Sequence, residues 1–63
     1  MTTEIQVQRK GKDITALRVK AETEDAARVE LESAAKHDAQ IRLFMLRCIL
    51  APAGSGWWIA RRV

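Results

Sequence analysis

The sequence predicts a single small α+β domain over residues 1–63: a four-stranded, largely antiparallel sheet with one helix packed on one face, in the order ββαββ. Three observations favour this fold class. Two stretches near the N-terminus alternate between apolar and polar residues. A central stretch has helical periodicity and a good N-cap. Two apolar stretches follow it, separated by a connection rich in Pro and Gly.

The first predicted strand covers residues 4–8 (EIQVQ), where Ile5 and Val7 share one side and polar residues the other. This strict alternation is typical of a half-buried strand. Residues 9–13 follow, and Gly11 supplies the positive φ that a short loop needs. The stretch therefore predicts a β-hairpin.

The second predicted strand covers residues 14–21 (ITALRVKA), whose β-branched content favours a strand. Leu17 and Val19 mark its core side, which leaves Arg18 and Lys20 on the opposite face. At period 2 the core side also includes Thr15 and Ala21, and the opposite face includes Ile14 and Ala16.

The predicted helix begins after Thr23, a good N-cap, and two acids occupy its first turn, where the helix dipole favours negative charge. We expect it to run to about His37, with cations in the last turn. Its apolar stripe is rich in alanine and contributes little bulk: Ala27, Leu31, Ala34 and Ala35.

Residues 40–51 (QIRLFMLRCILA) are apolar on both sides at period 2 and predict the third strand, in the middle of the sheet. One long helix from Thr23 to Leu50 is the alternative, because residues 37–40 contain no Gly or Pro to end the first helix. We favour the strand because residues 41–50 lack a polar helical face. The loop 52–56 and a fourth strand over residues 57–63 complete the sheet, with Trp57 and Ile59 expected to face the core.

Composition narrows the chemistry. A single cysteine excludes an internal disulfide and, with one histidine, a closed zinc site, so we expect no metal and no cofactor. We expect no membrane span and no secretory signal, because the apolar runs are short and the N-terminus is polar. A lone thiol also suits a reducing compartment, so we expect a cytoplasmic protein. The chain carries a formal charge of +3, but residues 22–38 hold six acids against two bases and the remainder nine bases against two acids.

The residue types used in catalysis have simpler interpretations here. His37 is expected to be a helix C-terminal residue, and Cys48 a small core residue without a cation to activate it. Gly54-Ser55-Gly56 lacks the Lys-Ser/Thr and the helix of a phosphate-binding loop, so it predicts a turn. No catalytic constellation is present, and we expect a protein that is not an enzyme and has no evident small-molecule substrate.

The first functional hypothesis is a homodimer. One short helix covers one side of a sheet, and a large apolar patch left uncovered on so small a protein usually marks an interface for another protein. We therefore expect a non-enzymatic interaction module of undetermined biological role that self-associates through the open sheet face. The predicted interface residues are Ile41, Leu43, Met45, Ile49 and Trp58.

The alternative hypothesis is a small nucleic-acid-binding protein. Positive charge combined with an exposed aromatic on the open face would neutralise phosphates and stack bases. The residues expected to do this are Arg18, Lys20, Arg47, Arg62 and Trp58, and the basic turn formed by Arg9, Lys10 and Lys12 is a second possible contact.

Overall fold

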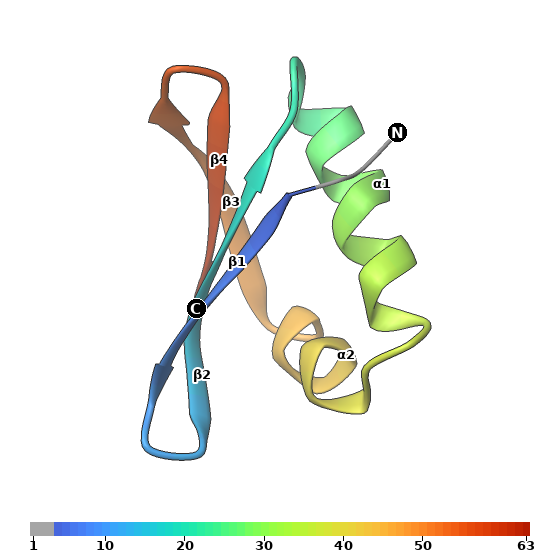
Figure 1. Ribbon diagram of the computed structural model, residues 1–63, viewed down its shortest axis with the longest axis vertical. Helices are drawn as coiled ribbons and strands as arrows, with labels where there is room; N and C mark the ends of the chain where they lie inside the picture. The colour runs from blue at the N-terminus through green and yellow to red at the C-terminus, as the bar shows by residue number, and fades with distance from the viewer. Residues whose placement is uncertain (1–3) are drawn as a thin grey trace.

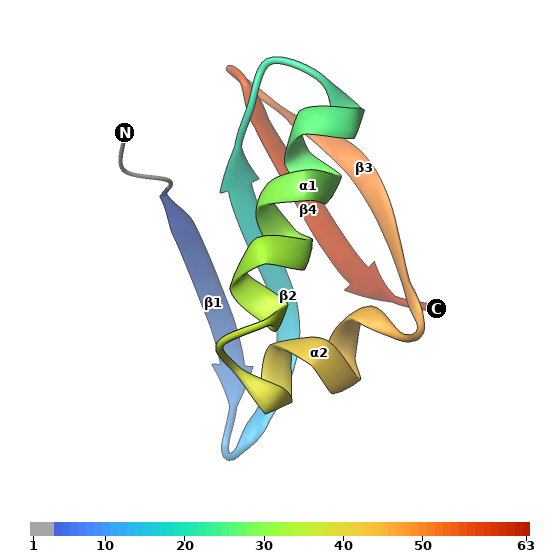
Figure 2. The same cartoon turned by 90° about the vertical axis from the view of Figure 1, so that its right-hand side faces the viewer.

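The computed structural model describes residues 4–63. Four strands form one sheet in the order β1-β2-β4-β3, with every neighbouring pair antiparallel. Two helices lie on the same face of this sheet, with the second crossing below the C-terminal end of the first, and the other face of the sheet is uncovered (Figures 1 and 2). The prediction of an α+β fold with a four-stranded antiparallel sheet is confirmed. The order ββαββ with one helix is wrong, because the chain has two helices between its hairpins.

Strands β1 (Ile5–Lys10) and β2 (Asp13–Lys20) form the predicted hairpin, and Gly11 has the expected positive φ of 63°. A bulge changes the alternation. Gln8 pairs with Ala16, but Arg9 pairs with Ile14, so Thr15 is left unpaired in the strand register, and its hydroxyl donates to the Gln8 carbonyl at 3.1 Å. As a result Ile14 is buried in the core and Thr15 is exposed, the reverse of the predicted orientation, whereas Leu17 and Val19 face the core as predicted.

Helix α1 (Glu24–Ala35) begins as predicted: the Thr23 hydroxyl accepts a hydrogen bond from the amide of Ala26 at 3.1 Å. The helix ends at Ala35, two residues before the expected end. The Arg42 Nε donates to the Ala35 carbonyl at 3.2 Å, which satisfies one of the acceptors left open at a helix C-terminus. The helix buries Ala27, Leu31 and Ala35 against the sheet.

Helix α2 (Ala39–Met45) replaces the first half of the predicted third strand. The carboxylate of Asp38 accepts hydrogen bonds from the amides of Gln40 at 2.9 Å and Ile41 at 3.4 Å, and the extended backbone of Asp38 separates α2 from α1. This N-cap explains both errors of prediction. Residues 38–45 are neither a strand nor part of one long helix, because α1 ends at Ala35 and Asp38 caps the start of a separate helix.

Strands β3 (Cys48–Gly54) and β4 (Trp57–Arg62) form the second hairpin, in which β3 lies at the edge of the sheet and not in its middle. An edge position tolerates Pro52, which has no amide to donate. Only Ser55 and Gly56 connect the two strands, both with positive φ, so the predicted loop over residues 52–56 is shorter than expected.

The core lies between the sheet and the two helices. Its largest fully buried side chains are Leu17, Val19 and Leu31, and α2 adds Ile41 and Phe44. Both helices pack on one face of the sheet and share one core, so the opposite face of the sheet is left uncovered.

Candidate functional site

The uncovered sheet face is built from alternate residues of all four strands. Register fixes which side chains share it: residues paired with the buried Leu17 and Val19 face the helices, and their neighbours face away. We call this set the open face. Its members are Gln6, Gln8, Ala16, Arg18, Lys20, Ile49, Ala51, Trp57, Ile59 and Arg61.

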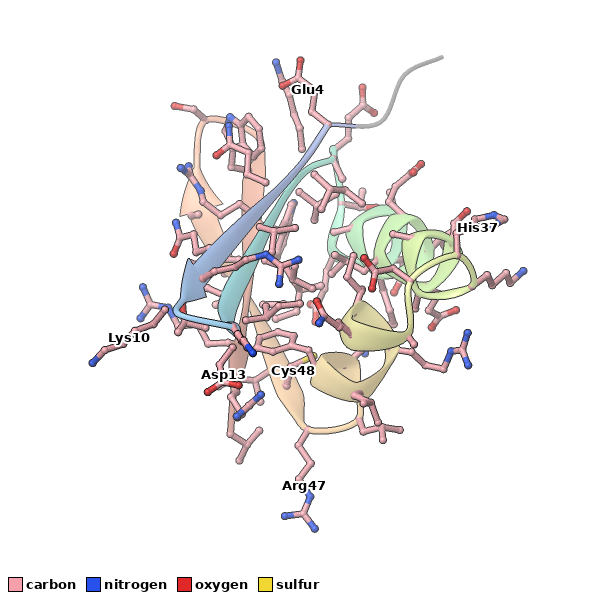
Figure 3. All side chains as sticks on the ribbon, turned by 60° about the horizontal axis from the view of Figure 1, so that its bottom comes forward. Glu4, Lys10, Asp13, His37, Arg47 and Cys48 are labelled. Carbon is pink, nitrogen blue, oxygen red and sulfur yellow. The ribbon has the colours of Figure 1, made fainter. Side chains whose placement is uncertain are left out.

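The charged side chains in the middle of the open face all carry positive charge. Its three charged side chains are Arg18, Lys20 and Arg61, and none of its ten residues is acidic. Glu4 and Asp13 continue the same side of the first hairpin at its two opposite ends, as Figure 3 shows, with Glu4 opposite Lys20 and Asp13 paired with Lys10. The centre of the face is therefore positively charged.

The open face has a polar half and an apolar half. Strands β1 and β2 carry the glutamines, Arg18 and Lys20, whereas β4 and β3 carry the large apolar side chains together with Arg61. The two halves meet where the Arg18 guanidinium lies over the ring of Trp57, 5.0 Å from the ring centroid. This contact is a cation–π interaction. Ala16 is only 5% exposed, so longer neighbours cover it although it belongs to this face.

A shallow hollow of about 420 Å³ lies at the apolar half, beside the edge strand. Ile59 and Arg61 from β4 form one side of it. The remaining lining residues come from β3: Ile49, Ala51, Pro52 and Ala53. Ile49 is 60% exposed, so an apolar group entering the hollow would meet an accessible aliphatic wall.

The structure exchanges the two tryptophans relative to the prediction. Trp58 lies on the covered face, where its indole Nε1 donates to the Ala21 carbonyl at 3.1 Å and its ring packs against the core. Trp57 and Ile59 occupy the open face instead. The error has a definite source: Ala60 is completely buried opposite Leu17, and its orientation determines that of every residue in β4.

The predicted nucleic-acid residues are only partly brought together. Arg18 and Lys20 share the open face as predicted. Arg62 points to the covered side, with its guanidinium 5.7 Å from the centroid of the Phe44 ring. Arg47 lies between α2 and β3 and points away from the body of the molecule (Figure 3). Arg61, which sequence reasoning did not select, takes the position expected for Arg62.

The predicted dimer interface does not form one surface. Ile41 is buried in the core, and Met45 is partly buried against it, both on α2. Leu43 is 68% exposed, but on the helical side, and Trp58 faces the core. Ile49 is the one member that lies on the open face. The prediction was wrong because it assumed a strand over residues that form helix α2 (Ala39–Met45), so alternate residues there do not share one side.

The catalytic residue types remain scattered. His37 follows the end of α1 and points into solvent (Figure 3). Cys48 is partly buried and its Sγ donates to the Met45 carbonyl at 3.7 Å. Burial raises the pKa of the Cys48 thiol, and the charge of Arg28 opposes that rise in part. Across residues 4–63, no three His, Cys, Asp or Glu side chains gather to hold a metal ion.

A second concave surface lies between the helices, on the opposite side of the molecule from the open face. This groove of about 360 Å³ is lined by Glu32, Ala35, Lys36, Arg42, Met45 and Leu46. Its charged side chains have both signs, so it has no preference for an anion or a cation. Leu46 is 73% exposed at its margin.

Comparison of this chain with protein-family models, with curated proteins and with solved structures gives no match. Within the part of the chain that the structure describes, neither helix has the length and apolar character needed to cross a membrane.

Proposed function

We propose that this chain is a non-enzymatic binding module whose open face binds nucleic acid. The observation that carries the proposal is the contact of Arg18 with the Trp57 ring, with Lys20 opposite Trp57 and Arg61 further along β4, and no acidic side chain among the ten residues of the open face. Cations neutralise phosphates, and an aromatic ring next to them offers a surface on which a base can stack.

The charge on the helical side of the molecule also supports binding of nucleic acid at the open face. Helix α1 carries exposed acids, among them Glu24, Asp25 and Glu32, and the segment 22–38 has six acids against two bases. A polyanion is repelled by this layer and attracted by the open face. The molecule is therefore polarised, and its geometry favours one side for an anionic partner.

A salt titration tests the proposal. Three neutralised phosphates of a single strand give a slope of log K against log salt of about −2, from roughly 0.7 per contact. The double variant Lys20→Ala/Arg61→Ala should lower both the affinity and the size of this slope. Its matched control is Lys36→Ala/Arg47→Ala, which removes two charges away from the open face. Equal losses in both variants would show that net charge, not this face, governs binding.

The proposed compartment is the cytoplasm. The single thiol of Cys48 is partly buried and has no partner cysteine in the chain, and it would persist as a thiol in a reducing compartment. Detection of the tagged full chain in a periplasmic or secreted fraction would contradict this assignment.

A second candidate function is self-association through the same face, which we also propose because of its apolar half. Ile49, Ile59 and Trp57 lie on it beside the exposed edge of β3. Two copies that overlap these halves would bury them and leave Arg18 and Lys20 towards the rim, where long cationic side chains remain hydrated. The result would be a homodimer that needs no disulfide.

Sedimentation equilibrium at tens of micromolar tests self-association. Ile59→Lys should shift the protein to monomer, because a charge then lies in the buried centre of the interface. Leu43→Lys is the control, since it places the same charge on an exposed apolar position of the helical side. A well-folded wild-type monomer at these concentrations would remove the dimer proposal.

A further inference from the structure

We infer that the open face takes single-stranded nucleic acid and not a duplex, with the sugar–phosphate backbone along β2 and the bases over β4 and β3. This inference rests on the proposed function and deepens it. The two halves of the open face supply the two kinds of contact that a single strand needs, and they lie side by side in a fixed order.

The backbone half is formed by Arg18 and Lys20. They are two residues apart on β2 and point to the same side, so their positions repeat along the strand at about 7 Å. Gln6 lies opposite Arg18 on β1 and adds a neutral amide that can donate to a phosphate oxygen. A chain of phosphates following β2 meets cations in succession.

The base half is formed by Trp57, Ile59 and the hollow beside them. The guanidinium of Arg18 already lies over the Trp57 ring at 5.0 Å, which shows that the ring accepts a flat group from the open side. A base stacking on Trp57 takes the place of this guanidinium and releases it towards the phosphates. A second base can enter the hollow against Ile59 and Ile49.

The shape of the face disfavours a duplex. Four strands span about 14 Å from β1 to β3, from three spacings of about 4.8 Å, whereas the major groove is about 12 Å wide and admits a helix or a two-stranded ribbon. Bases inside a duplex are also stacked on one another and cannot reach Trp57. A duplex would instead meet the tip of the first hairpin, where Lys10 and Lys12 lie next to Gly11.

The experiment compares one mixed-sequence DNA strand of about 12 nucleotides with the duplex that it forms with its complement. The reporter is Trp57 fluorescence in the Trp58→Phe background, which leaves one tryptophan, on the open face; circular dichroism checks that this variant is folded. We expect the single strand to quench Trp57 and to bind at least tenfold more tightly than the duplex.

Two further variants assign the contacts. Trp57→Ala should weaken single-strand binding by roughly 5-fold to 100-fold, measured by anisotropy of a labelled strand, without changing the salt slope, because it removes stacking and no charge. Trp57→Phe should restore most of the affinity. Lys10→Ala/Lys12→Ala should leave single-strand binding within about twofold, because the hairpin tip lies beyond the ten residues that form the open face.

The outcomes separate the inference from the proposed function. Equal binding of strand and duplex, with no quenching and no effect of Trp57→Ala, would overturn the single-strand inference and leave a basic binding face. Unchanged single-strand binding in Lys20→Ala/Arg61→Ala, together with loss of single-strand binding in Lys10→Ala/Lys12→Ala, would overturn both, because the contact would then lie at the hairpin tip and not on the open face. No binding of either nucleic acid at low salt would overturn both.

Discussion

Phe44 tests whether α2 belongs to the core, because its neighbour Leu43 provides an internal control. Phe44 is 2% exposed and Leu43 is 68% exposed, although both are large and apolar. Replacing a buried Phe by Ala costs about 3–5 kcal/mol, and a chain of this size has a total stability of about 3–5 kcal/mol. Phe44→Ala should therefore be largely unfolded.

The milder variant Phe44→Leu keeps most of the apolar volume and should lower the free energy of unfolding by about 1–2 kcal/mol. Part of that loss is the contact of the Arg62 guanidinium with the Phe44 ring. Leu43→Ala should change stability by no more than about 0.5 kcal/mol. Urea unfolding followed by far-UV circular dichroism measures both. If Leu43→Ala costs as much as Phe44→Leu, residues 39–45 are not the helix described here.

Three further predictions follow from single contacts. Asp38→Ala removes the N-cap of α2 and should cost about 1 kcal/mol in urea unfolding, whereas Asp38→Asn should retain most of the stability. Trp58→Phe loses the hydrogen bond to the Ala21 carbonyl and should cost about 1 kcal/mol, while Trp57→Phe should be nearly neutral in the same assay. Folding raises the pKa of Cys48 and so favours its neutral thiol. The free energy of unfolding gained in this way should be complete below the pKa of the unfolded thiol, about 8.5, and should fall as pH rises through the folded pKa. In the same assay at alkaline pH, Cys48→Ser should remove this loss of stability.

Sequence patterning was sufficient where one face of an element was polar. The alternation of residues 4–8 and the Thr23 N-cap predicted β1 and the start of α1 correctly. The pattern of apolar residues gave the wrong prediction over residues 40–51, because these residues are mostly apolar and fit neither the helical nor the strand period clearly. The available signal was Asp38, whose carboxylate caps a helix of seven residues, a length at which periodicity carries little information.

The candidate site depends on which side chains of β4 face the open side of the sheet, and the sequence alone does not determine this. Trp57 with Ile59 and Trp58 with Ala60 are both apolar pairs, and the prediction assumed that Trp57 and Ile59 face the core. In the folded chain the small Ala60 lies between Leu17 and Leu50, and Trp58 satisfies its indole N–H with a backbone carbonyl. The charges of Arg18 and Lys20 were placed correctly because Leu17 and Val19 fix the phase of β2.

The polarised charge of the molecule also constrains how copies of it can meet. Face-to-face contact brings Arg18, Lys20 and Arg61 of two copies close together, so its affinity should fall at low salt, where repulsion is least screened. Contact of the open face with the acidic surface of α1 on another copy has the opposite salt dependence. It joins two different surfaces and would extend into chains instead of closing as a dimer. A nucleic acid bound to the open face, as proposed, would compete with both arrangements. The sign of the salt dependence of self-association therefore distinguishes which surfaces of two copies are in contact. If the open face is one of them, adding a single strand should reduce self-association.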